Sequence, residues 1–196
     1  FYGVDNPPAK YIDFASEILQ IMGHFIVSSI RRRNLVRRLE IMSYTDPLTG
    51  FGNRYAMVKY VSGILPQTKI GVVYCDVTGL KRVNDEEGHS KGDQLIRRAC
   101  DCLRGTLKEF DLFRIGGDEF CVLIDDHNTC DISHLISCLR KEEAVYNASS
   151  RNIHLQIACG YAVFDSRTDA DLDALQKRAD QNMYENKKQL KTFSYR

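Results

Sequence analysis

The stretch DLFRIGGDEFCVLI, residues 111–124, decides how this chain can fold. Its two ends, DLFRI and FCVLI, are strand-like runs. Gly116 and Gly117 between them are typical of a tight hairpin turn, because both can adopt positive φ at little cost. Directly after the glycines come two acids, Asp118 and Glu119, where the second strand should already be apolar. Two adjacent carboxylates repel each other unless a cation lies beside them. The pair is therefore either solvated at the hairpin tip or part of a metal site.

The composition indicates one globular domain with an appended segment, because the chain has 196 residues of which 43% are hydrophobic. A net charge of +1 gives no reason to expect nucleic acid or an acidic membrane surface as a partner. The cysteines show no CxxC pair and no Cys/His metal spacing, and no apolar run approaches the roughly 18 residues of a membrane span. We therefore expect a reduced, cytoplasmic compartment and no membrane contact in this stretch. Because the chain begins with Phe1 and not Met, we expect a fragment of a longer protein, for which a membrane tether elsewhere stays open.

The N-terminal part, about residues 11–44, predicts one long helix. Ser29 and Arg32 interrupt its apolar stripe, and arginines occupy another face, most simply as a solvated basic surface. A helix of this length with a single apolar stripe needs a partner, and a second copy of itself is the simplest one. The stripe recurs in alternating steps of four and three, as in a coiled-coil seam, at Ile18, Met22, Phe25, Val36 and Leu39.

The segment SYTDPLTGFGNR, residues 43–54, is the clearest boundary, because Pro47, Gly50 and Gly52 all interrupt regular structure. We therefore divide the chain into a helical linker, 1–45, and a globular domain, 46–196. Beyond the boundary the patterns predict helices near 53–62, 91–108, 132–147 and 171–189, a helical turn at 80–86, and strands at 69–76 and 153–164 beside the hairpin. Helices that alternate with strands, together with an antiparallel hairpin, indicate an α+β fold.

The strand predicted at 69–76 is almost wholly apolar until it ends on Asp76, which is a common way to present a ligand on a rigid backbone. If this strand pairs beside the hairpin, we expect Asp76 and Asp118 to face each other across neighbouring strands. Carboxylates held that close favour a hard divalent cation such as Mg²⁺, which shares its remaining positions with water and substrate phosphates. From spacing alone, a metal site and a solvated turn remain equally open.

The segment after Asp76 suits a nucleotide. The loop from Thr78 to Lys81 leads into a short helix whose first amides, with a lysine nearby, suit phosphate oxygens. Asn84 and Asp93 match guanine, because a carboxylate accepts from N1–H and the exocyclic amine while an amide donates and accepts along the base edge. Taken singly, Asn84 and Asp93 are more often helix caps, and His89 a turn residue.

Four motifs then occur in order: DPLTGFGNR at 46–54, CDVTGLKRVNDEEGHSKGDQLI at 75–96, RIGGDEF at 114–120 and ADQNMYENKK at 179–188. Together they resemble the GGDEF family of diguanylate cyclases. The resemblance implies a ferredoxin-like nucleotidyl-cyclase palm, preceded here by a long signalling or coiled-coil helix. It also implies condensation of two GTP molecules into cyclic di-GMP with two Mg²⁺ or Mn²⁺ ions, and a homodimer in which each protomer holds one GTP.

The resemblance assigns roles residue by residue. Asp76 and Asp118 would be metal ligands, with the carbonyl of Val77 and the side chain of Glu119 helping. Asp118 and Glu119 would be catalytic, Asp118 by promoting deprotonation of the attacking 3′-hydroxyl. The substrate-binding positions would be Asn84, His89 and Asp93, the backbone near Leu80 and Lys81, Lys187 from the last helix, and Gly117, which lets the backbone approach the nucleotide.

Some positions depart from the family pattern. Thr78 stands where many members carry Asp, and Leu80 where Phe is common, but neither removes an implied metal ligand. The family's inhibitory RxxD motif is represented only by KEFD, Lys108 to Asp111, and lysine lacks the planar fork of arginine. We therefore expect weak or absent product inhibition. The usual GRN ending is also altered, with Lys188 and Lys191 after Lys187.

Other readings stay open. The main rival is a catalytically silent GGDEF module that binds a nucleotide and regulates a partner. A structural dimerisation piece and a cyclase with a different nucleotide product are further alternatives. In the favoured reading, the homodimer forms through the N-terminal helix and the two active sites face each other. That helix, FASEILQIMGHFIVSSIRRRNLVRRLE at 14–40, also resembles the end of a GAF-type sensor.

Overall fold

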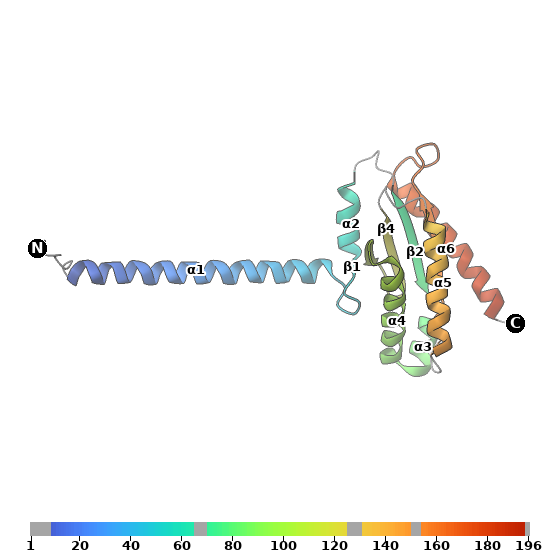
Figure 1. Ribbon diagram of the computed structural model, residues 1–196, viewed down its shortest axis with the longest axis horizontal. Coiled ribbons are helices and arrows are strands. Elements are labelled where there is room, and N and C mark those ends of the chain that lie inside the picture. The colour runs from blue at the N-terminus through green and yellow to red at the C-terminus, as the bar shows by residue number, and fades with distance from the viewer. Residues whose placement is uncertain (1–8, 65–69, 125–130, 150–153, 195–196) are drawn as a thin grey trace, which may run out of the picture. The chain divides into compact units, whose positions relative to one another are not determined.

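The computed structural model describes residues 9–64, 70–124, 131–149 and 154–194 (Figure 1). The chain divides into two compact units, residues 1–42 and 43–196. The helices are α1 (Ala9–Tyr44), α2 (Arg54–Ser62), α3 (Leu80–Glu87), α4 (His89–Leu107), α5 (Ile132–Ser149) and α6 (Leu172–Ser194). The strands are β1 (Gly52–Asn53), β2 (Gly71–Val77), β3 (Asp111–Arg114), β4 (Glu119–Ile124) and β5 (Ile157–Val163).

The five strands form one sheet in the order β1-β3-β4-β2-β5. β1 pairs with β3 in parallel, and the other neighbouring strands are antiparallel. Without β1, the strands and the helices between them follow the β-α-β-β-α-β pattern of a ferredoxin-like fold. The α+β palm with a long preceding helix, as expected from the sequence, is confirmed.

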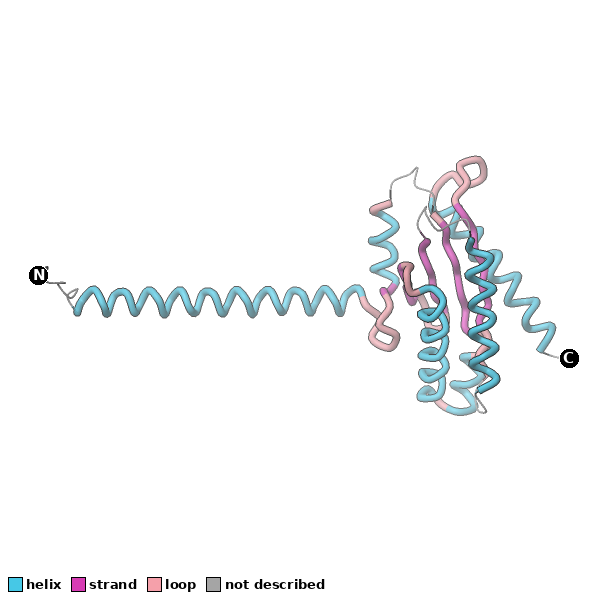
Figure 2. The backbone as a smooth tube through the Cα atoms, viewed as in Figure 1, coloured by secondary structure: helices cyan, strands magenta, loops and turns pink. Residues whose placement is uncertain are grey.

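Helices cover both faces of the sheet (Figures 1 and 2). On one face, α4 and α5 pack through residues such as Leu95, Leu103 and Leu139 against alternate positions of β2 and β4. On the other face, α2 and α6 pack through Met57 and Leu175. Because side chains alternate along a strand, a strand covered on both faces must be apolar at every position. That requirement explains the uninterrupted apolar run that leads to Asp76.

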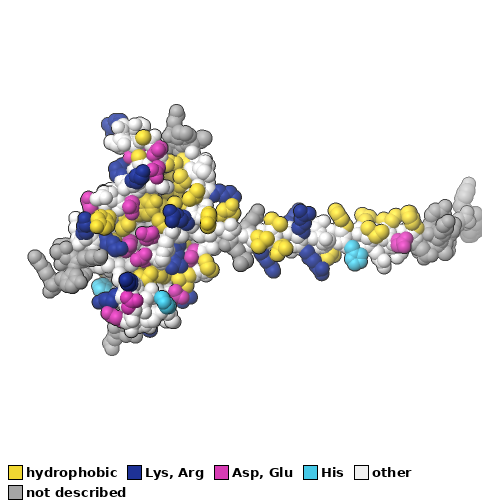
Figure 3. Space-filling view, turned by 180° about the vertical axis from the view of Figure 1, so that it is seen from behind, with side chains coloured by type: hydrophobic (Ala, Val, Ile, Leu, Met, Phe, Trp, Pro, Cys, Tyr) yellow, Lys and Arg dark blue, Asp and Glu magenta, His cyan; other side chains and the backbone are white. Residues whose placement is uncertain are grey.

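The helix α1 exposes large apolar side chains along much of its length, including Ile18, Met22, Phe25 and Leu39. Figure 3 shows hydrophobic side chains (yellow) and basic side chains (dark blue) exposed along α1. Within the described ranges, no helix combines the length and the apolar character that crossing a membrane requires.

Several element boundaries differ from those expected. The strand predicted at 153–164 begins at Ile157, and residue 153 lies outside the described residues. β1 was not predicted, since two residues carry no periodicity and its pairing with β3 joins segments about sixty positions apart in the chain.

The backbone of the hairpin glycines also differs from the expectation, because Gly116 and Gly117 do not have positive φ. The turn spans Ile115 to Asp118, and a connection of this length can be built without left-handed residues.

Candidate active site

The end of β2 meets the start of β4 at an acidic pair. Asp76 is only 3% exposed and lies directly opposite Glu119 in the antiparallel register. Opposite residues point to the same face, so both carboxylates lie on the face that α6 covers. Asp118 comes one position earlier and pairs through its backbone, since its carbonyl accepts a hydrogen bond from the Val77 N–H at 2.9 Å. The expectation that Asp118 directly faces Asp76 is therefore wrong by one residue: the residue opposite Asp76 is Glu119.

The two glycines of the hairpin tip differ in their surroundings. A Cβ on Gly116 would lie 2.6 Å from Oε2 of Glu119, so Gly116 leaves room for that carboxylate to fold back over the turn. A Cβ on Gly117 would meet no atom of the described residues within 4 Å, its two chain neighbours apart. The Gly117 backbone thus borders open space, which is what close approach of a ligand requires.

Burial and nearby negative charges raise the pKa of Glu119, although much of its side chain is exposed. Burial is the largest cause, followed by the negative charges of Asp118, Asp76 and Asp180, while Lys187 opposes the shift. Asp180 was missed by the sequence reasoning, although it lies seven residues before Lys187 and so on the same side of a helix. The site therefore concentrates negative charge from three segments of the chain.

Lys187 on α6 supplies a positive charge here, since its Nζ lies 2.5 Å from Oδ2 of Asp76. Both residues line a pocket of about 400 Å³, which the amine borders with its partly exposed side chain and Asp76 from a nearly buried position. The remaining lining comes from β4 and α6, through Glu119, Asp180, Gln181, Met183, Tyr184 and Lys188.

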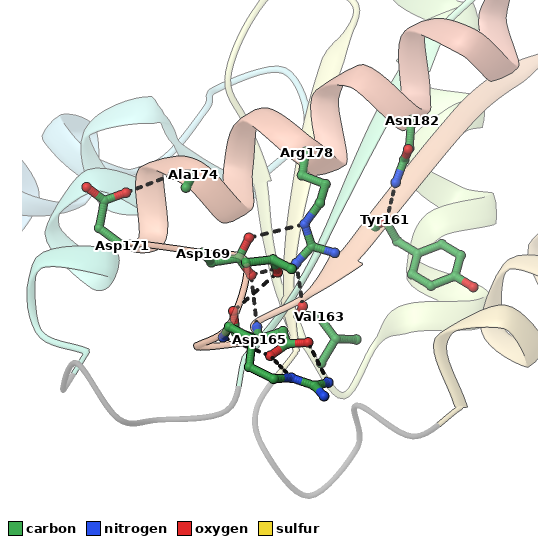
Figure 4. A network of polar contacts seen from close by, with 10 residues as sticks. Tyr161, Val163, Asp165, Asp169, Asp171, Ala174, Arg178 and Asn182 are labelled. Carbon is green, nitrogen blue, oxygen red and sulfur yellow. Dashed lines mark hydrogen bonds and ion pairs between the residues drawn. The ribbon is translucent and has the colours of Figure 1, made fainter.

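The position of α6 is set by bonds to the outer edge of β5 (Figure 4). Arg178, Asn182 and Asn186 follow one another at intervals of four residues. Arg178 donates to the Val163 carbonyl at 2.7 Å and Asn182 to the Tyr161 carbonyl at 2.9 Å, while Asn186 accepts from the Cys159 N–H at 3.0 Å. These bonds fix the position of α6 along β5. They therefore also fix where Lys187 lies relative to Asp76.

An ion pair with a buried carboxylate strengthens this attachment near the start of α6. The side chain of Asp169, before the helix, lies 2.6 Å from Arg178. In addition, Gly160 of β5 lies so close to α6 that a Cβ there would be 1.9 Å from the backbone nitrogen of Met183. The helix and the strand are thus in direct backbone contact.

The start of α3 lies just beyond the end of β2. Gly79 precedes the helix with φ 87° and gives it no side-chain cap, so the first amides, near Leu80 and Lys81, have no capping side chain from that position. The Thr78 hydroxyl is also buried without a hydrogen-bond partner among the described residues. Uncapped helix amides are a favourable environment for phosphate oxygens.

The expected base-reading residues lie where α3 turns into α4. Gly88, with φ 86°, is the one residue between the two helices, and its N–H donates to the Asn84 carbonyl at 3.0 Å. This sharp turn packs the last turn of α3 against the first turns of α4, so Asn84 comes next to Gly92 and thus near Asp93. Asp93 and His89 are exposed, and His89 is the first residue of α4.

The positions of the degenerate inhibitory motif lie apart from these groups in the sequence. Lys108 directly follows the last residue of α4 and Asp111 begins β3, and both side chains are exposed. The structure records no ion pair between these two residues.

The donor set fits a divalent cation completed by substrate oxygens. In the described part of the chain, no three Asp, Glu, His or Cys side chains converge into a ready-made metal site. Mg²⁺, however, is usually held by one or two carboxylates together with substrate phosphates and water. Asp76 and Glu119 are opposite each other, and after burial the nearby negative charges are the next causes of the raised pKa of Glu119, which a cation would offset.

Comparison with known proteins identifies relatives. The family model described as "Diguanylate cyclase, GGDEF domain" matches residues 43–192. The diguanylate cyclase DgcP of Escherichia coli is 27% identical over 207 aligned positions, which cover 96% of this chain and 60% of that protein. The cyclic di-GMP phosphodiesterase PdeR of the same organism is 31% identical over 78% of this chain and 24% of its own length. The chain spans between 18% and 60% of the length of these and similar curated relatives.

Among solved structures, the coiled coil and GGDEF domain of DgcB from Caulobacter crescentus, in complex with c-di-GMP, gives a TM-score of 0.74. The match covers 87% of this chain and 94% of that one at 20% identity. At this identity the likeness concerns the fold.

Proposed function

Because the chain belongs to the GGDEF diguanylate cyclase family, we propose that it condenses two molecules of GTP into cyclic di-GMP with release of pyrophosphate. The observation that carries the proposal is the pairing of Asp76 with Glu119 at the end of β2, beside Asp118 and next to the amine of Lys187. Acids on rigid strand ends with a lysine at a pocket form an arrangement suited to phosphoryl transfer.

Each group has a role in this proposal. Asp76, Asp118, Glu119 and the Val77 carbonyl would hold two Mg²⁺ or Mn²⁺ ions, which when bound neutralise the triphosphate and favour ionisation of the 3′-hydroxyl. Asp118 promotes deprotonation of that hydroxyl, and Glu119 assists at the same edge of the sheet. Lys187 and the first amides of α3, near Leu80 and Lys81, bind phosphate oxygens, while Gly117 leaves the backbone open to the nucleotide.

Base recognition falls to the turn between α3 and α4. Asp93 accepts from guanine N1–H and the exocyclic amine, which adenine cannot match, and Asn84 binds along the same edge. His89, exposed at the start of α4, contributes to substrate binding from the same turn.

We propose that the reaction takes place in a homodimer. Each protomer holds one GTP, so a product with two phosphodiester bonds requires two sites that face each other. The exposed apolar side chains of α1, such as Phe25 at 74% exposure, support pairing with a second α1. Residues 1–45 then act as a linker that continues the last helix of an upstream GAF-like sensor, and 46–196 as the cytoplasmic output domain.

The second candidate is a GGDEF module that binds a nucleotide without turning it over. It is favoured by one observation, that the sequence match extends to PdeR, which is named as a phosphodiesterase. The acidic hairpin argues for catalysis, because a silent module has no need to hold Asp118 and Glu119 at a glycine tip beside Asp76.

The proposal is tested by mass spectrometry of the products after incubation of the protein with GTP and Mg²⁺. Cyclic di-GMP that rises more steeply than linearly with protein concentration, and that disappears with EDTA or in Asp118→Ala, supports a dimeric cyclase. Asp101→Ala, a change at an exposed acid on α4, is the matched control and should leave product formation unchanged. GTP binding without any product, in a confirmed dimer, would favour the silent module.

A further inference from the structure

Gly92 lies inside a helix without a conformational reason to be glycine. It is the fourth residue of α4, it is buried, and its φ is not positive. Glycine is the least favourable residue in a helix interior after proline, because it loses the most backbone freedom on folding. A glycine with ordinary helical geometry therefore indicates that something must approach the backbone closely at that position.

The neighbour that approaches Gly92 is Asn84. A Cβ on Gly92 would lie 1.9 Å from Oδ1 and 2.9 Å from Cγ of Asn84, and 3.1 Å from Cδ1 of Leu80. The side-chain amide of Asn84 thus rests directly on the α4 backbone, one position before Asp93. Among the residues that the structure describes, this amide has no hydrogen-bond partner, so its polar atoms remain available to a ligand.

We propose that Gly92 is a positioning residue for base recognition: its missing Cβ is the space that holds the Asn84 amide beside Asp93. The inference rests on the proposed roles of Asn84 and Asp93 in binding guanine. Gly92 itself touches no base. It acts through Asn84, because a methyl group at position 92 would occupy the space in which the structure holds the Asn84 amide.

The clash created by Gly92→Ala would be relieved at the binding residue and not in the fold. The two closest atoms are the far end of a flexible side chain, so rotation of Asn84 away from α4 is sufficient. The 3.1 Å contact with Leu80 requires only a small shift. In the same substitution the helix gains a better helix former. We therefore expect Gly92→Ala to fold, with its melting temperature within about 3 °C of the parent protein.

The experiment measures equilibrium binding of 3′-deoxy-GTP and 3′-deoxy-ATP with Mg²⁺ by calorimetry. Both lack the attacking hydroxyl, so no turnover interferes. Gly92→Ala is expected to weaken 3′-deoxy-GTP roughly tenfold, the size of one or two hydrogen bonds to a base, and to leave 3′-deoxy-ATP unchanged. Asn84→Ala should cause the same loss. When Asn84 is already alanine, adding Gly92→Ala should cause no further loss of affinity, because the side chain that the new methyl group would displace is absent.

Gly105→Ala is the matched control in the same helix, since a Cβ there would meet no atom from other described parts of the chain within 4 Å. It should leave the affinity for both nucleotides unchanged. The inference is overturned if Gly92→Ala binds 3′-deoxy-GTP as tightly as the parent protein, or if it weakens binding equally with Asn84 already replaced. A parent protein that binds 3′-deoxy-GTP no better than 3′-deoxy-ATP would instead refute the guanine assignment itself, and the inference with it.

Discussion

Arg114, on the strand before the hairpin tip, forms an ion pair with Asp46, in the turn before β1, and its Nη1 lies 3.2 Å from both carboxylate oxygens. The two side chains are only 14% and 18% exposed. Nη2 of the same arginine donates to the Gly117 carbonyl at 2.7 Å. One guanidinium therefore joins the start of the globular unit to the tip that carries Asp118 and Glu119.

Replacing Asp46 with Asn should destabilise the protein in a pH-dependent way. Burial alone would raise the pKa of Asp46, but hydrogen bonds from Thr49 and Arg114 outweigh it and lower the pKa below its ordinary 3.8. The carboxylate then contributes stability above pH 3.8, and this is lost as the pH falls through the lowered value. Urea unfolding at pH 7 should show a loss of about 1–3 kcal/mol in Asp46→Asn, and the difference should shrink below pH 3.8. Asp101→Asn, at an exposed ion pair, should change stability by less than about 0.5 kcal/mol at both pH values. A pH-independent loss would contradict this account.

Glu119→Gln should stabilise the protein while weakening metal binding. The pKa of Glu119 is raised above its ordinary 4.5 by burial and by neighbouring acids, so the folded state holds this proton more tightly than the unfolded chain. Stability is therefore lost as the pH rises from 4.5 through the raised value. Because much of the Glu119 side chain is exposed, solvent screens this repulsion, and the neutral amide should raise the melting temperature in EDTA by only about 1–2 °C. Mn²⁺ titration should show weaker binding, and a lower melting temperature would argue against repulsion at this edge.

Gly160→Ala should be among the most destabilising single-methyl changes in the chain. The new Cβ would lie 1.9 Å from the Met183 nitrogen and 2.5 Å from the Asn182 carbonyl carbon, both backbone atoms that cannot rotate away. Either α6 moves off β5 or the strand bends, at a cost of about 3 kcal/mol or more in urea unfolding. Gly105→Ala offers the comparison, because the same methyl in open space should stabilise by about 0.5–1 kcal/mol. Equal effects of the two substitutions would show that α6 is not held in backbone contact.

Asp111→Ala should leave the affinity for cyclic di-GMP unchanged. Lys108 and Asp111 are the remnants of the inhibitory motif, and a lysine offers a point charge where arginine offers a planar, two-pronged donor. Calorimetric titration of cyclic di-GMP should give the same weak binding before and after the change. Tight binding that disappears with Asp111 would mean that product inhibition by this route is intact.

Most of the fold was predictable because its signals are local. The helices of the globular unit show clear periodicity, and the glycine tip between two apolar runs identifies the hairpin. What the sequence could not supply depends on contacts between distant segments. β1 exists only through its pairing with β3, and the choice of Glu119 as the partner of Asp76 depends on the register of β2 and β4.

The candidate site was predictable as a set of residues, but its supports were not. Asp180 and the Asp46–Arg114 pair are polar residues in ordinary helix and turn contexts, so nothing in their immediate sequence separates them from solvated surface. In the sequence, Gly92 is one residue of a motif, with no sign of why it is glycine. The explanation depends on the packing of α3 against α4 and on the position of the Asn84 side chain.

The bonds between α5, α6 and β5 have a consequence for association between copies of the chain. A border strand ordinarily offers free N–H and C=O groups onto which another strand can add, and this is a common route to aggregation. Here Ile157, Cys159, Tyr161 and Val163 each have an outward backbone group occupied by a side chain, from Arg140 or Glu143 of α5 or from α6. Two protomers can therefore come together at high local concentration without this border acting as a template for an intermolecular sheet.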